Sequence, residues 1–196
     1  KRPIDSSIPI VTMLRYITMT EHTRPDFHGI SSHPAGIGAV MRERPGKYLM
    51  LMQHAQEILR EDSHLSPTDR EVIAAFTSRL NGCEYCCGSH TAFAESLGAT
   101  ENDTRVIETL DTTGHRLSAL LEYVRVLTLS PSSISAADKA SVHDAGFTED
   151  ELKDAIAVCA AFNLFNRIVE GHGVAPRDDY SADAAQINNH GYDRRR

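Results

Sequence analysis

Apolar positions follow a helical period along most of the chain. Between residues 46 and 61 they recur three and four positions apart, which predicts an amphipathic helix. Ser66-Pro67 then supplies a cap and a first-turn proline, which predicts a second helix that ends near Asn81-Gly82. A third helix is expected directly after this turn, over residues 83–98.

Capping residues divide the following part of the chain into further helices. The expected helices are 100–110, 115–129, 135–146 and 149–170. Thr148 and Glu151 have the spacing of a capping box at the start of the last one, and Gly171 ends it. No stretch alternates regularly between apolar and polar residues, as a half-buried strand would. The sequence therefore predicts an all-α fold, a bundle of about six to eight helices.

The two ends of the chain lack this regularity. Residues 1–44 are rich in proline and glycine, and we interpret them as an irregular N-terminal arm with at most a short helix. Residues 45–174 are expected to form one helical domain, because a chain of this length supports a single core. Residues 175–196 are polar, and we expect a C-terminal tail that wraps a neighbouring molecule or stays disordered.

Charge and hydropathy argue against two classes of protein. The formal net charge of −7 argues against a general nucleic-acid binder, and the basic cluster at 194–196 is expected to be solvated. No apolar run approaches the roughly 20 residues that a membrane helix needs. Segment 8–17 lacks the cleavage pattern of a signal peptide, and the start at Lys1 is consistent with residues missing upstream. Three of the four cysteines lie within five positions, unlike a secreted disulfide framework, which favours a cytoplasmic protein.

The strongest chemical signal is the segment NGCEYCCGSH at 81–90. It places Cys83, Cys86 and His90 in a C-x-x-C-x-x-x-H array. At the start of a helix, the unpaired backbone N–H groups and the helix dipole stabilise a thiolate, and the second thiol lies within disulfide reach. His90 follows Cys86 by four residues, so both side chains share one face of the predicted helix.

Glu71 completes this candidate site. In an antiparallel hairpin that turns near Gly82, Glu71 faces about residue 93 and lies within one turn of His90. It also stands beside Val72 on the apolar side, so we expect it to be partly buried. A carboxylate beside an imidazole can relay protons to and from a thiol. The pattern predicts a central helical hairpin that carries a redox and proton-transfer site.

These residues also have plainer interpretations. An isolated C-x-x-C is often half of a metal site or incidental, and Glu71 or His90 alone is more often an ordinary helix residue. A structural zinc site would need a fourth ligand beside the two cysteines and the histidine of the array. The candidates for that ligand are Cys87, His115 and Cys159. Cys159 lies in an apolar run, so we expect it in the core.

The array of Glu71, Cys83, Cys86 and His90 resembles the signature of the alkyl hydroperoxidase D-like proteins, which belong to the carboxymuconolactone decarboxylase superfamily. The likeness covers roughly residues 45–172. The other similar segments, which look like the peroxidase-related branch, are 65–67, 78–81, 92–98 and the FNLFNR stretch at 162–167.

This resemblance implies an all-helical homo-oligomer, dimeric or trimer-based, that reduces hydroperoxides with thiols and no metal, haem, flavin or other cofactor. Cys86 would attack the peroxide and become a sulfenic acid, and Cys83 would resolve it to a disulfide. Glu71 and His90 would move the protons. An external dithiol must then reduce the disulfide, and the sequence identifies neither that donor nor the natural peroxide.

Two residues depart from the family pattern. Tyr85 precedes Cys86 where some members carry histidine, and Cys87 offers a competing resolving thiol. Two other functions stay open: a general disulfide oxidoreductase, and a non-catalytic helical oligomeric module with structural or zinc-binding cysteines. The helix 149–170 favours an oligomer, because its apolar residues cover more of its circumference than one core contact requires.

Overall fold

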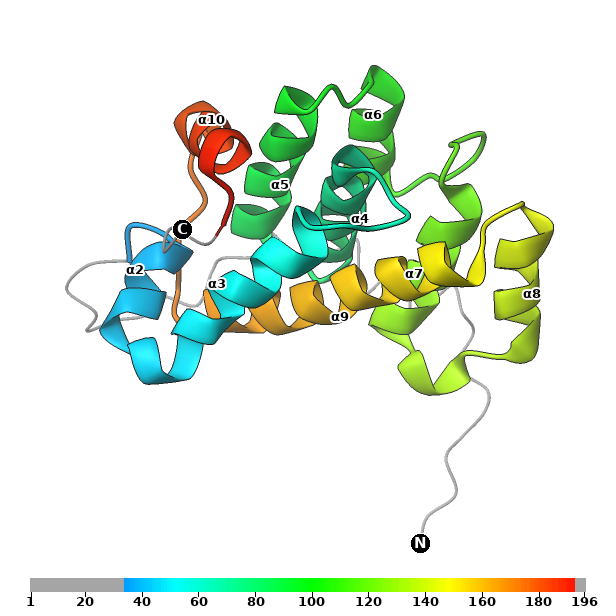
Figure 1. Ribbon diagram of the computed structural model, residues 1–196, viewed down its shortest axis with the longest axis horizontal. Helices are drawn as coiled ribbons and strands as arrows, with labels where there is room; N and C mark the ends of the chain where they lie inside the picture. The colour runs from blue at the N-terminus through cyan, green and yellow to red at the C-terminus, as the bar shows by residue number, and fades with distance from the viewer. Residues whose placement is uncertain (1–33, 193–196) are drawn as a thin grey trace, which may run out of the picture. The chain divides into compact units, whose positions relative to one another are not determined.

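The computed structural model describes residues 34–192, and every regular element in that range is helical (Figure 1). The α-helices are α2 (Ile37–Glu43), α3 (Pro45–Leu59), α4 (Pro67–Leu80), α5 (Glu84–Ser96), α6 (Glu101–Thr109), α7 (Ser118–Leu129), α8 (Ala136–Asp144), α9 (Glu149–Gly171) and α10 (Ser181–His190). A 3₁₀ turn at Pro131–Ser133 joins α7 to α8. The all-α prediction is confirmed, with seven α-helices, α3 to α9, between residues 45 and 174.

Four of the helices begin where a side chain supplies the acceptor that the first backbone amides lack. The Ser66 hydroxyl accepts from the Asp69 backbone N–H at 3.1 Å and so starts α4. Capping boxes at Thr100, Ser135 and Thr148 start α6, α8 and α9 in the same way. These are the starts that the sequence predicts, because capping is a local interaction.

Helix α4 is the centre of the core. It forms an antiparallel hairpin with α5, and α9 and α7 pack on its other sides. Figure 1 shows α9 running along the bundle, with α8 near its first turns and α2 near its last. The largest fully buried side chains include Phe76 of α4 and Phe162 of α9. Each such side chain contributes about 1.5–3 kcal/mol through burial, so the α4–α5 hairpin has a rigid support.

Residues 175–192 fold onto the helical domain instead of forming the expected polar tail. Helix α10 packs on α5, with Ala184 in the core and the partly buried Ile187 packed against it. Before it, Tyr180 lies against Gly88, where an added Cβ would come within 2.8 Å of the tyrosine ring. Tyr192 is buried after α10. The apolar residues at 180, 184 and 187 have helical spacing, which gives this segment a face to bury.

The predicted arm lies mostly outside the described residues. Of residues 1–44, the structure describes 34–44, and these contain the short helix α2. No helix in the described range 34–192 combines the length and the apolar character that crossing a bilayer requires.

Most of the apolar circumference of α9 packs within this chain. The buried positions on it include Val158, Ala161, Phe165 and Ile168. Leu164 remains 44% exposed, and Ala160 beside it is also exposed. The exposed apolar stripe of α9 is therefore narrower than its sequence alone indicates.

Candidate active site

The turn between α4 and α5 places the two cysteines of the motif. Gly82 adopts φ 69°, a left-handed conformation that favours glycine and reverses the chain. Cys83 stands at the residue just before α5, and Cys86 lies in the first turn of the helix, as predicted. The Cys83 backbone N–H donates to the carbonyl of Ser78 at 2.9 Å, which ties the motif to α4.

An amide cluster from α9 holds this turn. The Asn81 side-chain amide donates to Asn166 Oδ1 at 2.9 Å and to Asn163 Oδ1 at 3.2 Å. Asn166 in turn donates to the Ser78 hydroxyl at 3.0 Å and is buried. Buried amides need such partners, because each unpaired group costs about 1–3 kcal/mol. The FNLFNR stretch therefore fixes the turn that carries the cysteines.

Glu71 and His90 meet across the α4–α5 hairpin. Glu71 is fully buried, and its Oε2 lies 2.5 Å from Nδ1 of His90. The predicted contact is confirmed, although Glu71 is more deeply buried than the sequence indicates. The His90 ring packs edge-to-face on Phe162, with centroids 4.4 Å apart, and on Phe93 at 5.0 Å. These rings restrict the imidazole to one orientation.

The environment of Glu71 keeps its carboxyl group ionised. Burial alone raises the pKa of Glu71, but the charges of His90 and Arg60 and the hydrogen bonds from His90 and Tyr192 outweigh it. The resulting pKa lies below the ordinary value for glutamate. An ionised carboxylate can only accept, so Nδ1 of His90 carries the donated hydrogen. Nε2 is then the ring nitrogen left to exchange a proton.

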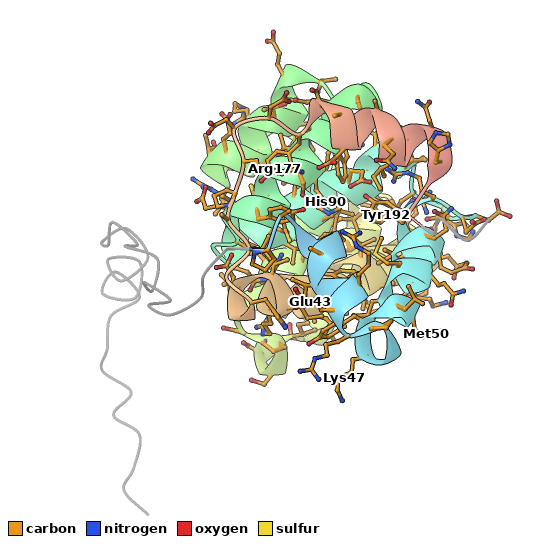
Figure 2. The ribbon with its side chains drawn as sticks, turned by 90° about the vertical axis from the view of Figure 1, so that its left-hand side faces the viewer. Glu43, Lys47, Met50, His90, Arg177 and Tyr192 are labelled. Atoms are coloured by element: carbon orange, nitrogen blue, oxygen red, sulfur yellow. The ribbon has the colours of Figure 1, made fainter. Side chains whose placement is uncertain are left out.

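A cavity of about 230 Å³ lies beside these residues, and both Cys86 and His90 line it. Figure 2 shows His90 and Tyr192 between α10 and the α2–α3 pair, which form its walls. Its lining is largely apolar and includes Met41, Met52, Leu59, Phe93, Phe165 and Ile187. Within residues 34–192, no direct hydrogen bond links Cys86 to His90. They share a space that a small reactant can enter.

Cys83 lies behind Cys86 and does not line the cavity. Its side chain is fully buried. The neighbouring Cys86 thiol, together with burial, raises the pKa of the Cys83 thiol. Both cysteines are free thiols in this structure. The pair thus comprises one thiol on the cavity and one protonated thiol beside it.

Tyr85 and Cys87, the two residues that depart from the family pattern, line different hollows of the structure. Tyr85 lines the cavity, and its hydroxyl accepts from the Ile37 N–H at 3.4 Å. Cys87 lines a different hollow of about 430 Å³, together with Tyr180. Burial raises the pKa of the Cys87 thiol to about 11. Cys87 is thus turned toward a different surface from Cys86.

His115 and Cys159, two of the candidates for a fourth zinc ligand, make hydrogen bonds to other residues. His115 Nε2 is 3.0 Å from Asp103 Oδ1, and its Nδ1 accepts from the Leu117 N–H. Cys159 is buried against the Thr128 hydroxyl at 3.3 Å, so its predicted place in the core is confirmed. Among the described residues, no three His, Cys, Asp or Glu side chains converge as a metal site would require.

Two further residues, Arg60 and Tyr192, belong to the site and are not predicted from the sequence. Arg60 Nη1 lies 2.6 Å from Glu71 Oε1, and the Tyr192 hydroxyl donates to the same oxygen at 2.8 Å. The available signal was the helical spacing of Tyr180, Ala184 and Ile187, which shows that the tail packs. It does not show where the tail packs.

The family comparison agrees with this geometry. The model of the carboxymuconolactone decarboxylase family matches residues 45–127, which contain the α4–α5 hairpin and the cysteine motif. The chain is 27% identical over 111 residues to the uncharacterized protein YdfG of Bacillus subtilis (strain 168). That match covers 55% of this chain and 76% of YdfG.

Two solved structures are similar in fold. One is the alkylhydroperoxidase AhpD core of an uncharacterized peroxidase-related protein from Ralstonia eutropha JMP134, with a TM-score of 0.67 and 23% identity. The other is an uncharacterized peroxidase-related protein from Silicibacter sp. TM1040, with a TM-score of 0.65 and 22% identity. Each match covers 74% of this chain and 78% of the other. Residues 45–127 are thus similar to the carboxymuconolactone decarboxylase family, and the chain has the fold of the alkylhydroperoxidase AhpD core.

Proposed function

We propose that this protein is a thiol-dependent hydroperoxide reductase in which Cys86 attacks the peroxide and Cys83 resolves the product. The observation that carries the proposal is that Cys86 and His90 line one cavity while Glu71 engages the other side of His90. The apolar lining suits the organic part of an alkyl hydroperoxide. The peroxidase-related solved structures of similar fold point to the same class of reaction.

The first step transfers one oxygen to sulfur. His90 Nε2 takes the proton of the Cys86 thiol, and the thiolate attacks the terminal oxygen of the hydroperoxide. The S–O bond forms as the O–O bond breaks. The leaving alkoxide receives the proton from His90, so the products are an alcohol and the Cys86 sulfenic acid. Glu71 stabilises the imidazolium between the two transfers.

The second step uses the buried thiol. Cys83 attacks the sulfur of the Cys86 sulfenic acid, a disulfide forms, and water leaves. An external dithiol must then supply two electrons to reduce the disulfide. Since Cys86 faces the cavity and Cys83 does not, we expect the donor to attack Cys86 first.

The test compares three cysteine variants of the reduced full chain. With cumene hydroperoxide as the oxidant and dithiothreitol as the donor, Cys86→Ser should lose turnover. Cys83→Ser should consume about one equivalent of peroxide and then hold a sulfenic acid that dimedone labels. Cys159→Ser, which removes a buried thiol outside the cavity, is the matched control and should keep turnover.

Two outcomes would decide against the proposal. Unchanged turnover in Cys86→Ser would refute the assignment of the attacking thiol. If the wild type exchanges with a small disulfide such as oxidised glutathione but consumes no peroxide, the site is a general disulfide oxidoreductase.

A further inference from the structure

Two residues outside the cysteine motif hold the Glu71 carboxylate on the side away from His90. We propose that Arg60 and Tyr192 are positioning residues that keep Glu71 ionised and fix its second oxygen on Nδ1 of His90. The proposal rests on the proposed role of His90 as the proton-transfer group for Cys86. It adds the C-terminal segment after α10 to the site.

The two oxygens of Glu71 have separate partners. Oε1 meets Arg60 Nη1 at 2.6 Å and accepts from the Tyr192 hydroxyl at 2.8 Å. Oε2 meets His90 Nδ1 at 2.5 Å. Because both oxygens are engaged, the carboxylate cannot rotate without breaking a charge-assisted hydrogen bond. Glu71 then orients and balances the charge of His90, and His90 alone exchanges the proton.

The positions of Arg60 and Tyr192 depend on each other. The Arg60 guanidinium lies over the Tyr192 ring, 5.0 Å from its centroid, and Nη2 donates to Asn188 Oδ1 of α10 at 2.9 Å. The Tyr192 backbone N–H donates to Gln56 Oε1 of α3 at 2.8 Å. Gly191 permits this approach, because a Cβ there would lie 2.3 Å from the same oxygen. The tail is thus bound to the end of α3 by polar contacts that converge on Glu71.

Three charged or titratable groups contact the Glu71 carboxylate, and each comes from a different segment of the chain. These are His90 from α5, Arg60 after α3 and Tyr192 after α10. Arg70, its neighbour on α4, acts at longer range, because its guanidinium donates to the carbonyls of Ile58 and Glu61. Arg60 and Tyr192 contact the carboxylate directly, and removing either one leaves both members of the His90–Glu71 contact in place.

The first test is the titration of the Glu71 carboxyl group in the reduced full chain, monitored by carbon-13 NMR. The Glu71 resonance is assigned by its absence in Glu71→Gln. Tyr192→Phe keeps the ring and removes the hydroxyl. We expect it to raise the titration midpoint by about one pH unit, the effect of losing one hydrogen bond to a charged group. The matched control is Tyr123→Phe, which changes a buried tyrosine of α7 that does not line the cavity and should leave the midpoint unchanged.

Arg60 provides a second pair of variants. Arg60→Met should raise the midpoint further than Tyr192→Phe, whereas Arg60→Lys keeps the positive charge and should restore most of the low value. If Arg60 had a purely structural role, both variants would melt at a lower temperature, but the midpoint of the Glu71 titration would be the same in the two.

The second readout needs no peroxide. Glu71 stays ionised at pH 7 in Tyr192→Phe, but its carboxylate is no longer held against Nδ1 of His90. Iodoacetamide alkylation of Cys86 at pH 7, followed by mass spectrometry, should therefore slow several-fold in Tyr192→Phe and stay unchanged in Tyr123→Phe. If both the Glu71 midpoint and the alkylation rate of Tyr192→Phe equal those of the wild type, the proposal is overturned. If they shift while the wild type consumes no hydroperoxide, the proposed function fails and the positioning role stands.

Discussion

Replacing Glu71 with glutamine should destabilise the protein, because the ion pair with Arg60 lies in the core. Glu71 is fully buried, and the Arg60 side chain is 11% exposed. Removing one member of a buried pair costs about 3–5 kcal/mol. Arg60 keeps its hydrogen bonds to the Leu59 carbonyl and to Asn188, so we expect the low end of that range, about 3 kcal/mol. For a domain of this size, that lowers the melting temperature by roughly 6–12 °C.

The pH dependence of this loss has a definite sign. The folded state lowers the pKa of Glu71 below its ordinary value of 4.5. The ionised carboxylate therefore adds its full stability above about pH 4.5, and this contribution disappears as the pH falls through the lower folded pKa. The difference in melting temperature between wild type and Glu71→Gln should be constant near neutral pH and should narrow only in more acidic solution.

Thermal unfolding followed by circular dichroism measures this difference. The matched control is Glu122→Gln, because Glu122 also accepts from an arginine, Arg125, but is 49% exposed. Such a pair is worth about 0–1 kcal/mol, so the control should melt within a few degrees of the wild type. If Glu71→Gln melts with the control at pH 7, the buried pair contributes nothing and the reasoning is refuted.

Three further predictions follow from other contacts. Asn166→Leu removes the amide between Ser78 and Asn81 and should cost about 1–3 kcal/mol in chemical denaturation; an unchanged midpoint would contradict the role given to the turn. Gly88→Val should displace Tyr180 and expose α10 to limited proteolysis, and an uncut tail would count against that packing. We propose that the chain forms a homo-oligomer through the exposed part of α9, which includes Leu164. Light scattering under reducing conditions should then give a mass above the 21.6 kDa of one chain, and Leu164→Glu should lower that mass. A wild-type mass of one chain rules the proposal out.

The parts of the fold that depend on local interactions could be predicted from the sequence. Helix starts at Ser66, Thr100, Ser135 and Thr148 follow from side chains three residues from the amides they cap. The meeting of Glu71 with His90 could also be predicted, because a tight turn fixes the register of two antiparallel helices.

The parts that depend on the path of the chain between distant segments could not be predicted. Tyr192 reaches Glu71 across 121 positions, and Arg60 reaches Asn188 across 128. Nothing in the local pattern around either residue specifies such a contact. The full burial of Glu71 was missed for the same reason, since a carboxylate is buried only when distant cations and donors surround it. For the same reason, the sequence overstates the apolar surface of α9 that is available to a second subunit, because part of it packs in the core of the same chain.

The amide cluster of Asn81, Asn163 and Asn166 limits how far the backbone has to move during a redox cycle. It anchors the backbone at the point where the cysteines would join and separate. Bond formation between Cys83 and Cys86 then requires rotation of two side chains, and the first turn of α5 need not unwind. We therefore expect the oxidised and reduced forms to share nearly the same hydrogen-exchange pattern in this turn. A reducing partner would have to recognise the oxidised form by its sulfur chemistry, since the surface around it stays the same.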